Sequence, residues 1–300
     1  MEQFPLVSIV TPAYNQAEYL AETIESVLAQ DYPNIEYIVL DDGSTDSTPE
    51  VLQRYKNRIR WERHENMGQA RTLNKGWSIA RGALLGYLSS DDCLSPKAIS
   101  QLVQKISDEP KASAVYCDFE LMDAQSRSFR TIFVEDFKAD RLYIDLVCQP
   151  GPGALFRREV FDTAGGWAEH LSQVPDFEFW LRAAKCGQFV RVPQVLAQFR
   201  VHEGSASFRP ISAARSMEIV EVMSSYWGKQ TGQKFQRSMA TAHLLAAKSH
   251  VQSGRLNAFF TQWRSALRYR PSIILSPNAW RTLLSGLLRR AAYQLNGRAR

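Results

Sequence analysis

The stretch IEYIVLDDGSTD, residues 35–46, decides the fold class because it joins an apolar strand to an acidic turn. Residues 35–41 are rich in β-branched and aromatic side chains, which favour a β-strand. The carboxylate of Asp41 follows this strand directly, and Gly43 permits a tight turn after it. Open α/β sheets bind their ligands at the carboxyl ends of their strands, so this turn predicts a binding edge.

Strands and helices alternate on both sides of this stretch. Further strands are expected at 6–11, 59–62 and 84–88, with helices at 17–30, 48–55 and 69–80. This alternation predicts a parallel sheet with right-handed crossovers. From residue 96 the pattern is mixed, with strands expected at 114–118, 151–156 and 195–201 and a helix at 177–185.

From residue 211 onward the chain reads as helical, with a helix pair that turns at Gly254. We therefore expect an α/β domain over 1–210, whose first half covers about 1–95 and whose second half covers about 96–210. A basic α-helical region is expected over 211–300. A chain of 300 residues is long enough to bury the core of such a domain and an appendage.

The charge of the chain is unevenly distributed. Residues 222–300 hold three Lys and ten Arg without any Asp or Glu, a local charge of +13, whereas residues 1–221 carry −8. An acidic body with a basic tail favours an anionic surface as partner. Nucleic acid is not expected, because no recognised nucleic-acid motif accompanies the charge.

The last predicted helix begins at Ser276-Pro277, a favourable N-cap and first-turn pair. Its leucines, from Leu283 to Leu295, share one face, which is flanked by Arg281, Arg289 and Arg290. This pattern is typical of a helix that lies peripherally on an anionic membrane. The alternative is that the leucine face docks on the α/β domain or on a second subunit of a homodimer.

The four cysteines are far apart and form no C-x-x-C pair, which indicates reduced thiols rather than a zinc ribbon or a disulfide framework. The first residues lack a basic segment and a long apolar run, so no signal peptide is expected. No stretch reaches the length that spans a bilayer. These observations predict a cytoplasmic protein, peripheral at the inner face of the membrane if the last helix binds lipid.

Four polar clusters follow predicted strands or open predicted helices. They are TPAYN at 11–15, DDGSTD at 41–46, GQAR at 68–71 and SSDD at 89–92. Asp91 and Asp92 place two like charges side by side, and a divalent cation is the usual remedy for their repulsion. Mg²⁺ or Mn²⁺ between these carboxylates and a diphosphate would also stabilise a departing nucleotide diphosphate.

Other polar side chains in these clusters suit a nucleotide. Asp41 is placed to accept hydrogen bonds from a base or a ribose, and Tyr14 either borders the base or packs against the protein. Arg71 lies at the start of a helix, where phosphate binding is favourable, although a surface ion pair is the alternative.

With these residues identified, the sequence resembles the family 2 glycosyltransferases of the GT-A fold from about residue 6 to residue 207. The motifs that carry the resemblance are VSIVTPAYN (7–15), DDGSTD (41–46), GQARTLNKG (68–76), YLSSDD (87–92), GALFRREVF (153–161), GGW (165–167), DFEFWLR (176–182) and FRVHEGSAS (199–207). Each motif is weak alone, but their order and spacing are specific. The resemblance implies an α/β fold with a mainly parallel central sheet.

The resemblance also implies a role for each matching residue. The donor pocket would be lined by Thr11, Pro12, Tyr14, Asp41, Asp42, Arg71 and Asp91. Asp92 would be the direct metal ligand, and His202 would approach the metal or the diphosphate. Asp176 would be the general base of an inverting transfer from a nucleotide-diphosphate sugar, with UDP favoured, to a hydroxyl of a glycan or polyisoprenyl-linked acceptor.

Two positions depart from the family pattern. Ser89 stands where the acidic motif often has another Asp, and Pro175 stands where a Glu often precedes the catalytic Asp. Glu178 faces either the acceptor or a neighbouring basic residue. Trp167 and Trp180 suit either a sugar platform or the core, and the core is favoured for Trp180.

Two other functions compete with glycosyl transfer. A sugar-nucleotide pyrophosphorylase would carry a Gly-rich, Arg-containing loop after the first strand, where this chain has PAYN at 12–15. A sugar-nucleotide-binding protein with a degenerate site is disfavoured because Asp92 and Asp176 are both retained. A processive synthase is also disfavoured, since the chain lacks a Q-x-x-R-W sequence.

Overall fold

The computed structural model describes residues 4–202, 204–205 and 210–298, with side chains up to residue 291. The chain forms two compact units. The first comprises residues 1–137, 148–170 and 175–201, and the second comprises residues 138–147, 171–174 and 202–300. The first unit thus ends before the boundary near residue 210 that the sequence suggests.

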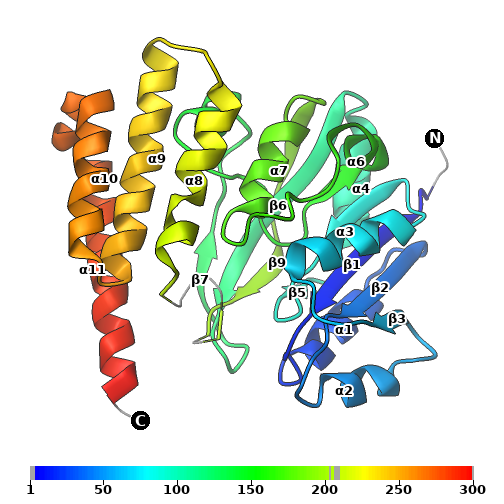
Figure 1. Ribbon diagram of the computed structural model, residues 1–300. Helices are drawn as coiled ribbons and strands as arrows, with labels where there is room; N and C mark the ends of the chain where they lie inside the picture. The colour runs from blue at the N-terminus through cyan, green and yellow to red at the C-terminus, as the bar shows by residue number, and fades with distance from the viewer. Residues whose placement is uncertain (1–3, 203, 206–209, 299–300) are drawn as a thin grey trace. The chain divides into compact units, whose positions relative to one another are not determined.

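One sheet of nine strands forms the first unit (Figure 1). The strands are β1 (Val7–Ala13), β2 (Ile35–Asp41), β3 (Arg60–Arg63), β4 (Leu84–Tyr87), β5 (Cys93–Leu94), β6 (Ala112–Met122), β7 (Ser128–Ile132), β8 (Leu155–Arg157) and β9 (Gln188–Arg200). Their order is β3-β2-β1-β4-β8-β6-β9-β5, with β7 paired to β6.

The predicted parallel sheet is confirmed for the first half of the chain. β1 pairs in parallel with β2 and β4, and β2 pairs in parallel with β3. β8 then runs antiparallel between β4 and β6, while β6 pairs in parallel with β9. The carboxyl ends of β1, β2, β3, β4 and β6 therefore lie at the same edge of the sheet.

Helices cover both faces of this sheet. They are α1 (Leu20–Leu28), α2 (Thr48–Arg54), α3 (Gln69–Ile79), α4 (Ala98–Asp108), α6 (Arg158–Ala164) and α7 (Pro175–Ala183). Successive strand residues alternate between two cores, as the pleat requires: Ile9 and Val39 pack with α1 and α4, whereas Val10 and Ile38 pack with α3 and α7. Burial on both faces explains why these strands read as continuous apolar runs.

The second unit is helical. Its elements are α5 (Ala139–Tyr143), α8 (Ala213–Trp227), α9 (Gln233–Gln252), α10 (Leu256–Tyr269), the 3₁₀ helix η1 (Pro271–Leu275) and α11 (Pro277–Arg298). The predicted turn at Gly254 is confirmed, and its φ of +80° explains the glycine. The Glu218 carboxylate of α8 accepts hydrogen bonds from the backbone N–H groups of residues 172–174, which joins that short segment to this unit.

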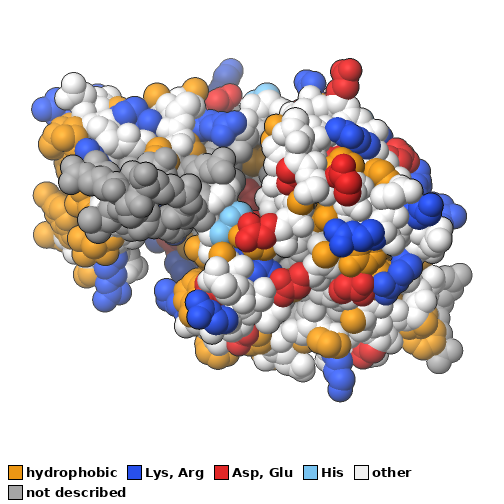
Figure 2. Space-filling view, turned by 90° about the horizontal axis from the view of Figure 1, so that it is seen from below, with side chains coloured by type: hydrophobic (Ala, Val, Ile, Leu, Met, Phe, Trp, Pro, Cys, Tyr) orange, Lys and Arg blue, Asp and Glu red, His pale blue; other side chains and the backbone are white. Residues whose placement is uncertain are grey.

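The leucine stripe of α11 does not form a single buried face. Leu283 is buried against α9 and α10, but Leu284, Leu287 and Leu288 are exposed. Figure 2 shows hydrophobic and basic side chains gathered over the C-terminal helices, at the left of the view. Leu295 lies outside the described side chains. None of the helices in the described ranges combines the length and the apolar character needed to cross a bilayer.

Candidate active site

The polar clusters predicted from the sequence meet at the carboxyl edge of the sheet. Ala13 pairs with Asp41, and Asp41 pairs with Arg63, so the ends of β1, β2 and β3 lie side by side. The backbone N–H of Leu88, just after β4, donates to the carbonyl of Val10. The edge therefore gathers the segments that were expected to form a donor site.

Asp41 is completely buried at this edge. Its Oδ1 accepts a hydrogen bond from the Ser44 N–H at 2.9 Å. Its Oδ2 has no hydrogen-bond partner among the described residues and lies 3.3 Å from Nε of Arg63. A carboxylate oxygen with spare acceptor capacity suits the N–H of a base or the hydroxyl of a ribose.

Arg63 was not identified from the sequence. Its guanidinium also donates to the carbonyl of Ser44 at 2.8 Å, so it braces the acidic turn while remaining about half exposed. The available signal was register: in a parallel pair, the last residue of the short strand β3 falls next to Asp41.

Asp42 holds the loop that leads into α3. Its two carboxylate oxygens accept hydrogen bonds from the backbone N–H groups of Met67 and Gly68, at 2.7 and 3.0 Å. Arg71, in the first turn of α3, forms a 3.1 Å ion pair with Glu169 on the surface. Asp42 therefore shapes this loop, while Arg71 carries its charge on an exposed side chain that already has one carboxylate partner.

The residues at the end of β1 and just after it differ in how far their side chains are exposed. Thr11 and Pro12 are buried, and the Thr11 hydroxyl lies 3.1 Å from the Tyr37 hydroxyl. Tyr14 follows the strand with 47% of its surface exposed. Of these three residues, only Tyr14 has a side chain that is exposed to a ligand. Thr11 and Pro12 are buried at this edge of the sheet.

The acidic pair follows β4. Asp92 is buried, and its Oδ1 accepts a hydrogen bond from the backbone N–H of Arg200 at 2.9 Å. Burial raises the pKa of Asp92 well above its usual range, and the nearby charge of Asp91 raises it further. A divalent cation would reverse this penalty, because it favours the charged form of both carboxylates.

These two carboxylates fit a cation that takes its other ligands from a diphosphate and water, as Mg²⁺ commonly does. Within residues 4–202, 204–205 and 210–298, no group of three or more His, Cys, Asp or Glu side chains is arranged to hold a metal by itself.

Arg200 anchors the acidic pair and was missed as a functional residue. Its side chain is fully buried, and its Nε donates to the carbonyl of Asp91 at 2.8 Å. The same guanidinium pairs with Glu22 of α1 at 2.7 Å, donates to Ser126 in the β6–β7 turn at 2.8 Å, and lies over the ring of Tyr19. A rigid fork with five donors suits this junction of three chain segments.

Asp176 lies in the first turn of α7 and is half-buried. Burial raises its pKa, although the backbone N–H groups of Phe177 and of Asp176 itself act in the opposite direction. The pKa of Tyr87 is raised well above its usual value, first by burial and then by the charges of Asp176 and Asp92. The charges of both carboxylates thus reach Tyr87, the last residue of β4.

Glu178 and the two tryptophans have structural partners. Glu178 forms a two-pronged ion pair with Arg182, with both nitrogen–oxygen distances at 2.7 Å. Trp180 is buried against Phe156 and Phe189, which confirms its place in the core. Trp167 is also buried, and it packs against Tyr87 with ring centroids 5.0 Å apart.

His202 belongs to the second unit, so its assignment as a metal ligand stays a prediction. Residues 203 and 206–207 of its motif lie outside the described residues.

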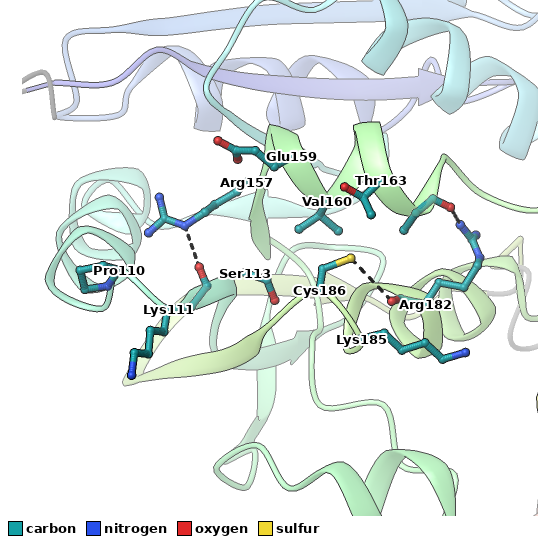
Figure 3. A pocket seen from close by; sticks show the side chains of 12 residues that line it. Pro110, Lys111, Ser113, Arg157, Glu159, Val160, Thr163, Arg182, Lys185 and Cys186 are labelled. Atoms are coloured by element: carbon teal, nitrogen blue, oxygen red, sulfur yellow. Dashed lines mark hydrogen bonds between the residues drawn. The ribbon is translucent and has the colours of Figure 1, made fainter.

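A pocket of about 740 Å³ lies elsewhere in the first unit (Figure 3). Its polar lining includes Lys111, Arg157, Glu159, Arg182, Lys185 and Cys186. Arg157 pairs with Leu84 at the amino end of β4, so this pocket is at the opposite edge from Asp92. None of the predicted site residues lines it.

Comparison with known proteins places these features in a family. The profile described as "Glycosyl transferase family 2" matches residues 8–165, more than half of the chain. An uncharacterized glycosyltransferase of Rickettsia typhi is 32% identical over 212 residues, which cover 68% of this chain and 66% of that protein. Chondroitin synthase of Escherichia coli is 26% identical over 215 residues, which cover 70% of this chain and 31% of that protein. The chain therefore spans less than two thirds of the length of these relatives.

Solved structures share the fold. S. aureus TarS 1–349 in complex with UDP-GlcNAc matches with a TM-score of 0.66 at 18% identity, covering 97% of this chain and 92% of that one. The mannosyltransferase PcManGT of Pyrobaculum calidifontis, in complex with GDP-Man and Mn²⁺, matches with a TM-score of 0.62 at 18% identity. That match covers 98% of this chain and 88% of the other. Both likenesses confirm the GT-A fold.

Replacing Arg200 with Met tests its anchoring role. The change removes the guanidinium that donates to the Asp91 carbonyl and pairs with Glu22, and it leaves Met in a fully buried position among these polar groups, so we expect a loss of about 2–4 kcal/mol of unfolding free energy. Hydrogen exchange should accelerate at residues 91–93 and 123–127. Arg127→Met is the matched control, because Arg127 is an exposed arginine of the β6–β7 turn that Arg200 contacts. Equal exchange rates in the two variants would contradict the anchoring role of Arg200.

Proposed function

The chain belongs to glycosyl transferase family 2, and we propose that it transfers a sugar from a nucleotide-diphosphate donor to a hydroxyl of a glycan or lipid-linked acceptor, with inversion. The observation that carries this proposal is the gathering of the acidic segments after β1, β2 and β4 at one edge of the sheet, and the charges of both Asp92 and Asp176 reach Tyr87 at the end of β4. One carboxylate is set in an acidic pair suited to a cation, and the other opens a helix and has a raised pKa.

The donor is proposed to lie along the carboxyl ends of β1, β2 and β4. Asp41 would accept a hydrogen bond from the nucleoside through its Oδ2, which has an ion-pair partner in Arg63 but no hydrogen bond among the described residues, and Tyr14 would border the base. Arg63 and Arg71 would supply positive charge near the nucleotide. A UDP-sugar is favoured, with UDP-GlcNAc bound to TarS and GDP-Man bound to PcManGT as the two precedents in the shared fold.

Asp92 would hold a divalent cation, with Asp91 next to it in the chain. Mn²⁺ or Mg²⁺ bound there would supply the positive charge that a departing nucleotide diphosphate requires. Arg200 would keep Asp92 in place through its backbone N–H and the Asp91 loop through its guanidinium.

Asp176 would act as the general base. As the acceptor oxygen forms a bond to the anomeric carbon, its proton moves to the Asp176 carboxylate, and the bond from that carbon to the diphosphate oxygen breaks. The first-turn N–H groups of α7 orient the carboxylate without neutralising it. Because Glu178 is engaged by Arg182, Asp176 is the carboxylate of this helix that is left to act as base.

Asp176→Asn tests the base. Nucleotide diphosphate release from UDP-GlcNAc or GDP-mannose, with Mn²⁺ and a trial acceptor, should fall by about 10²-fold or more, because Asn cannot accept the proton. Donor affinity measured by calorimetry should stay within a few-fold of the wild type. Asp162→Asn, an exposed change on α6, is the control. Normal turnover in the Asp176 variant would sink the assignment.

The pH profile gives an independent check. A general base works when deprotonated, and burial raises the pKa of Asp176. Activity should therefore be lost as the pH falls through that raised value, at a pH above the usual Asp pKa of about 3.9. We expect kcat/KM to fall tenfold per pH unit on this limb. A limb at or below the ordinary Asp value would contradict the burial of the acting group.

We further propose that the C-terminal helices contact the inner face of an anionic membrane peripherally, with docking between two copies as the alternative. Leu275 is 80% exposed and Leu288 is 62% exposed, on a region that carries +13. Apolar anchors within positive charge are complementary to anionic lipid. Such contact would bring the enzyme to a lipid-linked acceptor.

Flotation with vesicles tests this contact. The wild type should float with phosphatidylglycerol-containing vesicles at low salt, and float less at 0.5 M salt because the charges are screened. Leu284→Gln combined with Leu288→Gln should reduce flotation, whereas Phe133→Gln, at an exposed aromatic of the first unit, should not. No flotation together with a dimer on sedimentation would instead assign the face to a second copy.

A further inference from the structure

The proposed reaction leaves one buried amide of the first unit without a role. Gln149 is only 1% exposed. Neither its Oε1 nor its Nε2 has a hydrogen-bond partner among the described residues. Buried side-chain amides are nearly always hydrogen-bonded, so an amide with both ends unpartnered points to a group that arrives from outside the chain.

The topology of the sheet places Gln149 at the carboxyl edge, where the polar clusters meet. It stands six residues before Leu155, the first residue of β8. Leu155 pairs with Gly86 of β4 on one side and with Val115 of β6 on the other, antiparallel to both. The segment that precedes β8 therefore lies toward the carboxyl ends of those two strands, where Asp92 also lies.

The neighbours of the segment locate it more closely. The pKa of Cys148, next to Gln149, is raised by burial and then by the charge of Asp176. On the other side, a Cβ at Gly153 would lie 2.9 Å from the side chain of Leu94, two residues after Asp92. The segment from 148 to 153 thus has one end within reach of the Asp176 charge and the other packed against the strand that follows the acidic pair.

The backbone of this segment has little room to move. The Cys117 thiol lies 3.9 Å from the carbonyl of Pro152, and a Cβ at Gly151 would lie 3.0 Å from the ring of Phe119. The φ of +78° at Gly153 fixes a turn that other residues rarely adopt. Because the main chain is held against β6, Gln149 cannot move readily to solvent to satisfy its amide.

We propose that the Gln149 amide hydrogen-bonds a hydroxyl of the transferred sugar, an inference that rests on the proposed function. An amide offers an N–H donor and a carbonyl acceptor, and a sugar hydroxyl needs both an acceptor and a donor. Gln149 lies in a segment with Cys148 within reach of the Asp176 charge and Gly153 against Leu94, at the edge of the sheet where a sugar would sit if its anomeric carbon faced the base and its diphosphate faced Asp92. A buried amide discriminates strongly against a sugar that lacks the matching hydroxyl, because the amide then remains unpaired.

Gln149→Met tests the proposal, because Met keeps the length of the side chain and removes its polar end. Binding is measured by calorimetry with Mn²⁺ and four probes: UDP, UDP-GlcNAc, GDP and GDP-mannose. The variant should bind the accepted nucleotide diphosphate as the wild type does. Its affinity for the corresponding nucleotide sugar should fall about tenfold or more, which removes the wild-type preference for the sugar-bearing ligand.

The stability of the ligand-free protein gives a second readout. If Gln149 serves a ligand, removing its unpartnered amide should leave Tm unchanged or raise it by about 2–4 °C. A structural glutamine would show the opposite, a clear fall in Tm. Gln104→Met, at an exposed glutamine of α4, is the matched control and should alter neither affinity nor Tm.

The outcomes separate the two proposals. If the wild type binds none of the four probes, the proposed UDP-sugar or GDP-sugar donor fails, and the role of Gln149 at that donor fails with it. If the wild type prefers a nucleotide sugar and Gln149→Met keeps the same preference, the role of Gln149 is overturned while the proposed function stands. A fall in the Tm of the ligand-free variant also overturns it.

Discussion

The burial of three carboxylates at one edge of the sheet is the constraint on which the first unit depends. Asp41, Asp42 and Asp92 are each at most 3% exposed. A buried charge is costly unless donors or an opposite charge surround it. The turn after β2, the loop before α3 and the end of β9 each supply backbone N–H groups to one of these carboxylates. The edge is thus built around negative charge, which backbone N–H groups and the guanidinium groups of Arg63 and Arg200 partly balance.

Arg200 shows how distant parts of the chain share this constraint. Its position at the end of β9 lets one residue meet the acidic loop through both main chain and side chain. The same guanidinium reaches α1 and the β6–β7 turn, so the acidic pair cannot shift without disturbing two other elements. This explains why a loop of like charges keeps a defined shape.

The sequence predicted correctly the elements whose extent is determined by the local pattern of residues. The strand at 35–41 and the helix at 256–269 begin and end at the predicted residues, because the apolar pattern of each element extends along its full length. β9 was expected from residue 195 but begins at Gln188, since its first residues gain their order from pairing with β6 rather than from their own pattern. The antiparallel course of β8 also depends on pairing between distant strands.

The site shows the same division. Asp41 and Asp92 were proposed from the sequence because they follow predicted strands, and Asp176 because its motif resembles that of the family; their roles stay predictions. Arg63, Arg200 and Gln149 were not proposed, because their importance comes from neighbours that only folding supplies. Glu178 was left open for the same reason, and its ion pair with Arg182 resolves it.

The antiparallel direction of β8 has an evolutionary consequence. Because β8 begins at the carboxyl edge of the sheet, the residues just before it lie at that edge and pair with no strand among the described residues. Substitutions at those residues therefore leave the pairing of the neighbouring strands intact. Within residues 148–153, however, an added Cβ at Gly151 or Gly153 would crowd Phe119 or Leu94, so change is expected at positions such as 149. If Gln149 contacts the sugar as proposed, related enzymes could acquire new sugar preferences by changing this one side chain, without altering the first half of the sheet.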